Sequence, residues 1–267
     1  VFLDTSDGNK HNQISQFKKA VILNKERHNN NLKVTYDTPC YFSIEEVLNY
    51  IKNKNSMTTY IDGESVFLAI NEKLRLTVAD ENLWETHKFL DSTGNGKHPT
   101  LGKISRDSTF YGEFDKFISR LETKLEDRRL DFLLCPKIAG KYLNTGDFTQ
   151  IITQLIGYSN KSNISIVDLS GIPFELMNIT ISLISRILFD FSFHYSRIQH
   201  AEKHTNQIPF MLVCEEAHNY IPRESSQDYK ASKRAIERIA KEGRKYGLSL
   251  MVVSQRPSEV SETIFSQ

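Results

Sequence analysis

The sequence is poor in cysteine and has almost no excess of charge of either sign. Its three cysteines, Cys40, Cys135 and Cys214, lie far apart and form no C-x-x-C pair. The pattern therefore indicates neither a zinc site nor a disulfide framework, and a reduced cytosolic compartment is the simplest context. The formal net charge of +1 gives no overall basic field, so bulk attraction to nucleic acid is not evident from composition.

Long uninterrupted apolar runs are also absent. The longest apolar helix that we expect, around residues 179–193, contains Arg186 and Asp190. We therefore interpret it as a core helix rather than a membrane span. No signal peptide is visible in the sequence. We predict a cytoplasmic protein without a membrane segment.

The chain has the length and composition of an ordinary globular protein. Its 267 residues suffice for one sizeable core with an inserted subdomain, and 25% of them are charged and 39% hydrophobic. Residues 17–160 are polar and predict helices at residues 43–52, 82–90, 114–126 and 148–156. From residue 164 onward, apolar strands alternate with helices. This alternation predicts a doubly wound α/β core, with the polar block as a mostly helical insertion.

A short apolar run at residues 211–214 ends abruptly in Glu215 and Glu216. A continuous apolar run, entered here through Pro209 and Phe210, is typical of a strand buried on both faces of a parallel sheet. Ligands bind at the carboxyl ends of such strands. There, Glu215 can reach a magnesium ion on nucleotide phosphates, and Glu216 can polarise an attacking water molecule. A strand that happens to end in two glutamates before a helix cap would look the same.

The segment after this strand completes a crossover unit. Residues 229–246 predict a helix, Gly247 ends it, and residues 248–253 form a second apolar run. Strand, helix and strand in this order make a parallel crossover, so Glu216 and Gln255 should emerge at the same edge of the sheet. The amide of Gln255 can sense the terminal phosphate of a nucleotide there.

The end of the chain resembles a known family. Residues 238–250 and 253–260 look like the HerA group of hexameric DNA-translocating ATPases, which are relatives of FtsK. Residues 166–173, Ile-Val-Asp-Leu-Ser-Gly-Ile-Pro, resemble the preceding strand and turn of that family. The resemblance implies a RecA-like P-loop NTPase core with a mostly parallel sheet, in which residues 161–267 carry the Walker B and sensor strands.

The resemblance also implies a homohexamer that uses ATP and Mg²⁺ to move along double-stranded DNA through its channel. In this group the ring commonly works with an effector. The effector is a nuclease in end resection, or a nuclease or sirtuin-type NAD hydrolase in antiphage defence. A ring needs only a few cationic donors per subunit to line a channel, so the low net charge does not exclude DNA.

Arg244 is the arginine that the resemblance places across a subunit boundary from a nucleotide. Its guanidinium stays charged and can stabilise negative charge on a transferring phosphoryl group. The other interpretation is a helix-end cation that complements the macrodipole. Four further cations share one helical face, which predicts a solvated surface: Arg234, Arg238, Lys241 and Lys245.

One element that the resemblance requires is missing. No segment fits the phosphate-binding pattern G-x-x-x-x-G-K-[ST]. The nearest, residues 91–98, has the central Gly-Lys. However, it has Asp91 in place of the first glycine and His98 in place of the final hydroxyl residue, so an exposed turn is its default interpretation.

The start of the chain suggests where that loop belongs. Residues 1–4 contain no methionine and read as a strand that ends in Asp4, like the strand that follows the phosphate loop in this family. We therefore expect the chain to be an internal portion of a longer polypeptide, with residues 1–16 as the start of the ATPase core. Asp4 is then either a nucleotide-site residue or a strand-end residue that caps a turn.

These observations predict an ATP-driven DNA translocase or helicase of HerA type. Two alternatives stay open. A conjugation or secretion coupling ATPase of the same superfamily would carry transmembrane helices upstream. A non-catalytic ring scaffold that organises an effector would lack an intact phosphate-binding loop upstream.

Overall fold

The structure is a computed structural model of the chain. It describes residues 10–265, apart from residues 30–32, 39, 71–74, 78–82, 92–96, 99, 107–109, 135–136, 139–140, 143–146, 160, 203–207 and 224–229. The chain divides into two compact units, Val1–Ile166 and Val167–Gln267. Asp4 lies outside the described residues.

The first unit is built on three helices, α1 (Lys10–His28), α2 (Ile44–Ser56) and α3 (Asp115–Glu126). Their apolar side chains form one buried cluster that includes Val47, Leu121 and Phe117. The helices predicted at residues 43–52 and 114–126 are therefore confirmed. Ser43 caps α2 by accepting a hydrogen bond from the backbone N–H of Glu46 at 3.3 Å, as a serine before an amphipathic segment favours.

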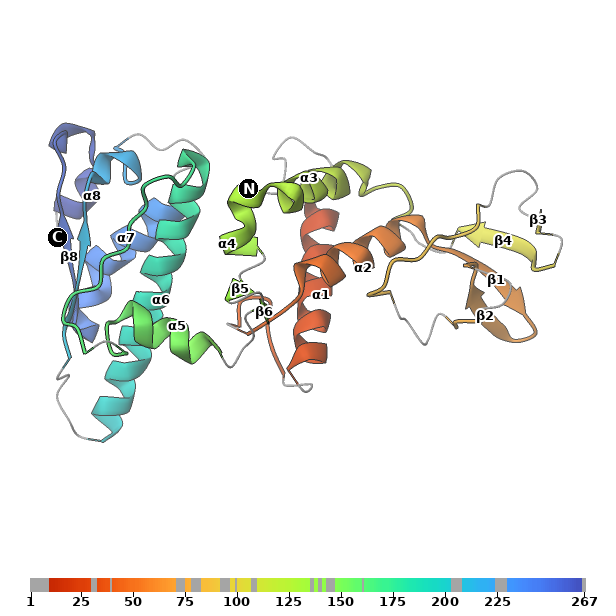
Figure 1. Cartoon of the computed structure of the whole chain (residues 1–267), viewed down its shortest axis with the longest axis horizontal. Helices are drawn as coiled ribbons and strands as arrows, with labels where there is room; N and C mark the ends of the chain where they lie inside the picture. The colour runs from red at the N-terminus through yellow and green to blue at the C-terminus, as the bar shows by residue number, and fades with distance from the viewer. Residues whose placement is uncertain are drawn as a thin grey trace. The chain divides into compact units, whose positions relative to one another are not determined.

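An antiparallel sheet follows α2, with strand order β2-β1-β4-β3 (Figure 1). Its strands are β1 (Thr58–Asp62), β2 (Ser65–Leu68), β3 (Lys97–His98) and β4 (Gly102–Arg106). Gly63, with a φ of 65°, makes the tight turn that joins β1 to β2, because glycine adopts positive φ without steric cost. The polar block is therefore not purely helical.

The helix predicted at residues 82–90 is wrong, because no helix is present in the described part of that segment. Side chains of α2 instead donate hydrogen bonds to the backbone carbonyls of this segment. The Asn53 amide donates to the carbonyls of Leu83 and Glu85 at 2.8 Å each, and the Asn49 amide donates to that of Trp84 at 3.2 Å. These tertiary hydrogen bonds outweigh the local helical tendency.

Smaller elements complete the first unit. They are η2 (Arg128–Leu130), α4 (Asp131–Leu134), the antiparallel pair β5 (Lys137–Ile138) and β6 (Lys141–Tyr142), and α5 (Asp147–Leu155). The last of these confirms the helix predicted at residues 148–156.

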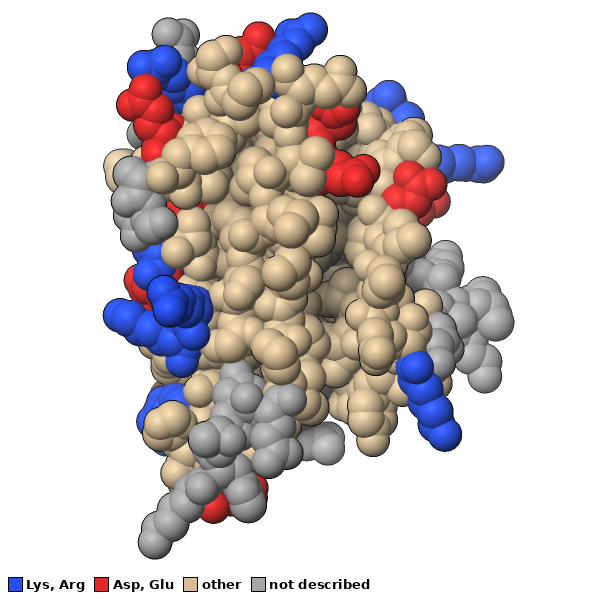
Figure 2. Space-filling view, turned by 90° about the vertical axis from the view of Figure 1, so that its left-hand side faces the viewer, with Lys and Arg blue, Asp and Glu red and all other residues tan. Residues whose placement is uncertain are grey.

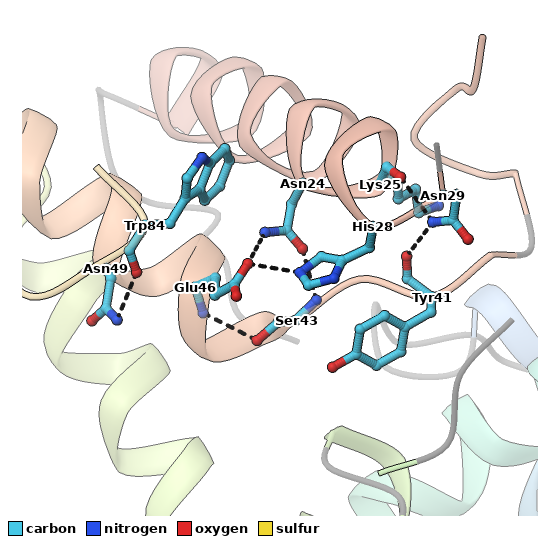
Figure 3. A network of polar contacts seen from close by, with 9 residues as sticks. All are labelled: Asn24, Lys25, His28, Asn29, Tyr41, Ser43, Glu46, Asn49 and Trp84. Carbon is cyan, nitrogen blue, oxygen red and sulfur yellow. Dashed lines mark hydrogen bonds and ion pairs between the residues drawn. The ribbon is translucent and has the colours of Figure 1, made fainter. Parts of the chain in front are cut away.

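Polar contacts lock α1 to α2 and to the segment between them (Figure 3). One carboxylate oxygen of Glu46 accepts hydrogen bonds from the Asn24 amide at 2.6 Å and from the His28 ring at 2.8 Å. On α1, the buried ammonium group of Lys25 donates to the carbonyls of Tyr36 and Thr38. Buried polar groups are stable only when they are paired in this way.

The second unit contains the predicted crossover. Strand β7 (Phe210–Cys214) lies parallel to β8 (Leu248–Val252), and α7 (Lys230–Glu242) connects them. The 3-10 turn η5 (Gly243–Tyr246) follows α7, and Gly247 ends it with a φ of 73°. The predicted helix, its stop and the parallel pairing are therefore confirmed. The short elements η3 (Ala217–Asn219), η6 (Pro257–Glu259) and α8 (Glu262–Phe265) surround the carboxyl ends of the strands.

Helix α6 (Phe174–Ala201) packs with α7 on one side of the two strands (Figure 1). By length and composition alone, its residues 176–201 could cross a membrane, a test that core helices of soluble proteins also pass. Phe189 of α6 is buried against Ile239 of α7 and Leu248 of β8. This packing agrees with the interpretation of the segment as a core helix.

The other face of the β7–β8 sheet is open. The apolar side chains that face outward here, which we call the open face, are Met211, Val213, Met251 and Val253. Figure 2 shows this side of the unit, where charged groups lie at the rim and few lie in the centre. The prediction of a strand buried on both faces is therefore wrong for this structure. An apolar run does not distinguish a covered face from an open one.

The strand that the resemblance implies within residues 166–173 is also absent from the structure, which assigns no strand there. Ile166 is 88% exposed and Ile164 is 75% exposed. The fold is thus α/β, and its parallel sheet consists of two strands within the described residues. The mostly parallel sheet of a RecA-like core is only partly present.

The Glu46 contacts predict how the stability of the first unit depends on pH. Burial alone would raise the pKa of Glu46, but hydrogen bonds from His28 and Asn24 and nearby positive charge outweigh burial and lower it. A carboxyl group with a lowered folded pKa stabilises the fold above its ordinary pKa, and this contribution is lost as the pH falls from that value through the folded pKa. We expect Glu46→Gln to lose about 1 kcal/mol at pH 7 and the difference from the parent to shrink as the pH falls through the folded pKa of Glu46.

The measurement is urea unfolding followed by tryptophan fluorescence. Trp84 is the sole tryptophan of the chain and stacks on Tyr50 at a centroid distance of 4.8 Å, so it reports on the first unit. Glu126→Gln, an exposed carboxylate at the end of α3 in the same unit, is the matched control. A stability difference that persisted unchanged at pH 3 would contradict the assignment to the Glu46 carboxylate.

Candidate active site

Two backbone hydrogen bonds shape the turn that follows β7. The N–H of Val253 donates to the carbonyl of Cys214 at 2.9 Å, and the N–H of Ala217 donates to the carbonyl of Val253 at 3.1 Å. Glu215 and Glu216 therefore form a two-residue excursion whose ends are both held on one residue of the neighbouring strand. The excursion lies at the carboxyl edge of the sheet, where ligands of parallel sheets bind.

This tight anchoring forces Glu216 into a rare backbone conformation. Its φ of 48° and ψ of 43° place it in the left-handed region, which costs a residue with a Cβ atom roughly 1 kcal/mol. The turn is held by its surroundings: the Glu216 carbonyl accepts the N–H of Asn219 at 2.9 Å. The Tyr220 hydroxyl donates to the Glu215 carbonyl at 2.5 Å, and the Ser232 hydroxyl of α7 donates to the Tyr220 carbonyl at 2.7 Å.

The Glu216 side chain faces groups from the end of β8. Its Oε1 accepts a hydrogen bond from the Gln255 amide at 2.9 Å. Its Oε2 lies 3.4 Å from Nδ1 of His218, and the same ring nitrogen lies 3.1 Å from the Ser254 hydroxyl. Glu216 remains 46% exposed, so a water molecule can still reach the carboxylate. The structure thus brings Glu216 and Gln255 together.

Glu215, directly after β7, is exposed. Within the described ranges, no group of three or more His, Cys, Asp or Glu side chains could hold a metal by itself. Mg²⁺ usually takes one or two protein carboxylates and completes its octahedral shell with water and substrate phosphates. One exposed carboxylate at a strand end therefore fits Mg²⁺ bound together with a nucleotide, and Glu215 would be its ligand.

Comparison with known proteins finds relatives among DNA repair helicases. No protein-family model matches the chain. The DNA double-strand break repair helicase HerA of Saccharolobus solfataricus is 30% identical over 219 residues, which are 82% of this chain and 36% of that protein. HerA of Sulfolobus acidocaldarius is 26% identical over 222 residues, which are 76% and 42% of the two chains.

A shorter match has a higher sequence identity. HerA of Pyrococcus furiosus is 48% identical over 59 residues, which are 22% of this chain and 10% of that protein. The chain is homologous to the C-terminal part of HerA. It spans less than half the length of these relatives.

Arg244 of this HerA-type chain does not lie beside Glu216. It lies exposed in η5, at the start of β8, whereas Glu216 and Gln255 lie beyond its end. The five residues of β8 alone separate the two ends by about 17 Å, at ~3.3 Å per residue. Arg244 therefore cannot reach the Glu216 carboxylate of its own chain. The position of Arg244 in the last turn before β8 also fits the helix-end cation that the sequence left open.

The remaining sequence candidates lie elsewhere. Residues 92–96 of the weak phosphate-loop candidate lie outside the described residues, and Lys97 and His98 form strand β3 of the antiparallel sheet in the first unit. That position differs from a phosphate loop, which follows a buried parallel strand and opens a helix. The candidate cations of α7, Arg234, Arg238 and Lys241, are exposed, as predicted for a solvated face.

Sequence reasoning did not find the contact between His218 and Ser254. These residues are 36 positions apart, and their proximity depends on the excursion after β7 curling back over the end of β8. A sequence signal did exist, because a parallel crossover brings the residues after each strand to one edge. It applied to Ser254 as much as to Gln255.

Cys214, next to the excursion, offers a test of how firmly this end of the sheet is closed. Burial raises the pKa of its thiol to about 11. Since the thiolate is the reactive form, we expect alkylation in the folded protein at pH 8 to be about 100-fold slower than in the unfolded chain. The measurement is iodoacetamide labelling of a Cys40→Ser, Cys135→Ser chain, with and without urea.

The urea sample is the control for the intrinsic reactivity of Cys214. Equal labelling rates in the folded and unfolded samples would show that the carboxyl end of β7 opens freely, and would contradict the clamped turn described above.

Proposed function

We propose that this chain is the C-terminal part of the ATPase core of a HerA-type, ATP-driven translocase or helicase for double-stranded DNA. In this proposal residues 161–267 belong to a RecA-like core, and residues 17–160 are an insertion in it. The observation that carries the proposal is the 2.9 Å hydrogen bond between Gln255 and Glu216 at the carboxyl edge of a parallel crossover. The homology to proteins named DNA repair helicases supports it.

The roles follow from the chemistry of each group. Glu216 is the general base, because its carboxylate is accessible to water and is held by the Gln255 amide. Glu215 is the Mg²⁺ ligand, and the bound ion would neutralise charge on the phosphates. Gln255 is the sensor: its amide donor, which now binds Glu216, is the group that a terminal phosphate oxygen would compete for.

The assembly that this proposal requires is a homohexameric ring. Arg244 lies at the opposite end of β8 from Glu216, so it can contribute to hydrolysis only from a neighbouring subunit. Double-stranded DNA would pass through the channel. The ring would act in the cytoplasm with an effector, such as a nuclease or a sirtuin-type NAD hydrolase, in antiphage defence or DNA end processing.

The first test is ATP turnover by the complete polypeptide, with and without double-stranded DNA. We expect turnover to rise with DNA, and Glu216→Gln to reduce it by at least about 100-fold while ATP binding is kept, since only the water-activating group is lost. Glu202→Gln, an exposed carboxylate at the end of α6, is the matched control. Negligible turnover in the parent would instead favour a ring scaffold.

Mixing of subunits tests the position of Arg244. We expect Arg244→Ala and Glu216→Gln to be inactive alone and to recover activity when mixed, because about a quarter of interfaces in a random 1:1 ring join an intact base to an intact arginine. In the control series, Arg186→Ala takes the place of Arg244→Ala in the mixtures with Glu216→Gln. Arg186 is an exposed arginine of α6, so the Arg186→Ala variant should be active alone. No recovery at any mixing ratio would count against a role across the boundary.

A further inference from the structure

His218 is a nearly buried polar residue that the proposed chemistry does not use. Its side chain is only 14% exposed, in η3 directly after the excursion. Its Nδ1 lies near two oxygens at once, the Ser254 hydroxyl at 3.1 Å and Glu216 Oε2 at 3.4 Å. His218 therefore connects the turn after β7 with the residues after β8.

The surroundings select one protonation pattern for the ring. Ser254 Oγ already accepts a hydrogen bond from the backbone N–H of Arg256 at 3.0 Å. If Nδ1 carried a lone pair, that lone pair would face a carboxylate oxygen. A proton on Nδ1 instead donates to the Ser254 hydroxyl, and it turns the positive edge of the ring toward Glu216 Oε2, 3.4 Å away, as an electrostatic contact. We therefore assign the ring a proton on Nδ1.

Glu216 needs such support because its own geometry does not fix the carboxylate. The side chain is half exposed and has three rotatable bonds, and Gln255 holds only Oε1. A contact to Oε2 from a nearly buried ring restricts rotation of the carboxylate about its last bond. General-base catalysis depends on this orientation, because small displacements of a positioned group lower the rate steeply.

From this geometry we propose that His218 is a positioning residue, which orients the Glu216 carboxylate through Nδ1 and is itself held by Ser254. The proposal rests on the proposed function, because it assigns Glu216 as the base. His218 does not touch the nucleotide, so its loss should lower kcat and leave nucleotide affinity unchanged. Outer contacts of this kind typically contribute 10- to 100-fold.

The test uses four variants of the complete polypeptide: His218→Ala, His218→Asn, His218→Gln and Ser254→Ala. The Asn amide can place a donor near the position of Nδ1, whereas the longer Gln side chain places its donor near that of Nε2. We expect His218→Ala to lower kcat about 10- to 100-fold with the Kd for a fluorescent ATP analogue within about twofold. Asn should restore most of the rate, and Gln should not.

A double mutant separates positioning from general damage. Added to Glu216→Gln, His218→Ala should cause no further loss, because the group that it positions is already gone. A further loss there, or equal losses in the Asn and Gln variants, would overturn the positioning role. An unchanged kcat in His218→Ala would overturn it as well. If His218→Ala fails to fold, Ser254→Ala tests the same link, with a smaller expected loss of kcat.

A spectroscopic measurement keeps this inference distinct from the proposed function. Two-dimensional NMR of ¹⁵N-labelled imidazoles should show the His218 proton on Nδ1, with a shift that changes in Glu216→Gln; the His218→Asn spectrum assigns the signal. A proton on Nε2 alone would overturn the contact even in an active ATPase. The parent could also show the Nδ1 proton signal but no ATP turnover. That result would overturn the proposed function and the catalytic role of His218, and only the contact between His218 and Glu216 would stand.

Discussion

The site depends on the backbone of a single residue, Val253. Its N–H and its carbonyl bind the two ends of the excursion after β7, so the sheet ladder continues past Glu215 and Glu216 without including them. Both glutamates are therefore presented at the edge by a ladder that is itself rigid. The left-handed backbone of Glu216 follows from the same clamp, because two residues must reverse the chain between fixed points. Strain of this kind persists only where the surroundings impose it.

The rest of the second unit keeps Val253 in place. Inward-facing residues of both strands pack on α6 and α7, and Gly243 allows the turn after α7 to approach β8 closely. A Cβ atom at Gly243 would lie 2.4 Å from the Leu248 carbonyl oxygen. The parallel crossover then brings both strand ends to one edge. The first unit uses a different principle, in which buried polar groups such as Lys25 bind backbone carbonyls of an irregular segment.

The sequence predicted the parts that depend on local pattern. Apolar periodicity and Gly247 located α7, and the crossover rule placed Gln255 beside Glu216. It could not predict what tertiary hydrogen bonds decide. Residues 82–90 look helical, yet Asn53 occupies their carbonyls. The exposure of one face of β7 depends on which elements come to lie against it, and no short-range pattern encodes that.

The open face of the β7–β8 sheet has a chemical consequence. Met211 and Met251 are 60% and 46% exposed, and they lie on the two strands that carry the site. Thioether sulfur at an accessible position is readily oxidised to the sulfoxide, which is polar and chiral. Mild peroxide would therefore mark this face selectively and change its wetting, while Cys214 on the opposite face stays protected by burial. In the chain as it stands here, oxidation of Met211 and Met251 would thus make the open face polar without changing the carboxylates of Glu215 and Glu216.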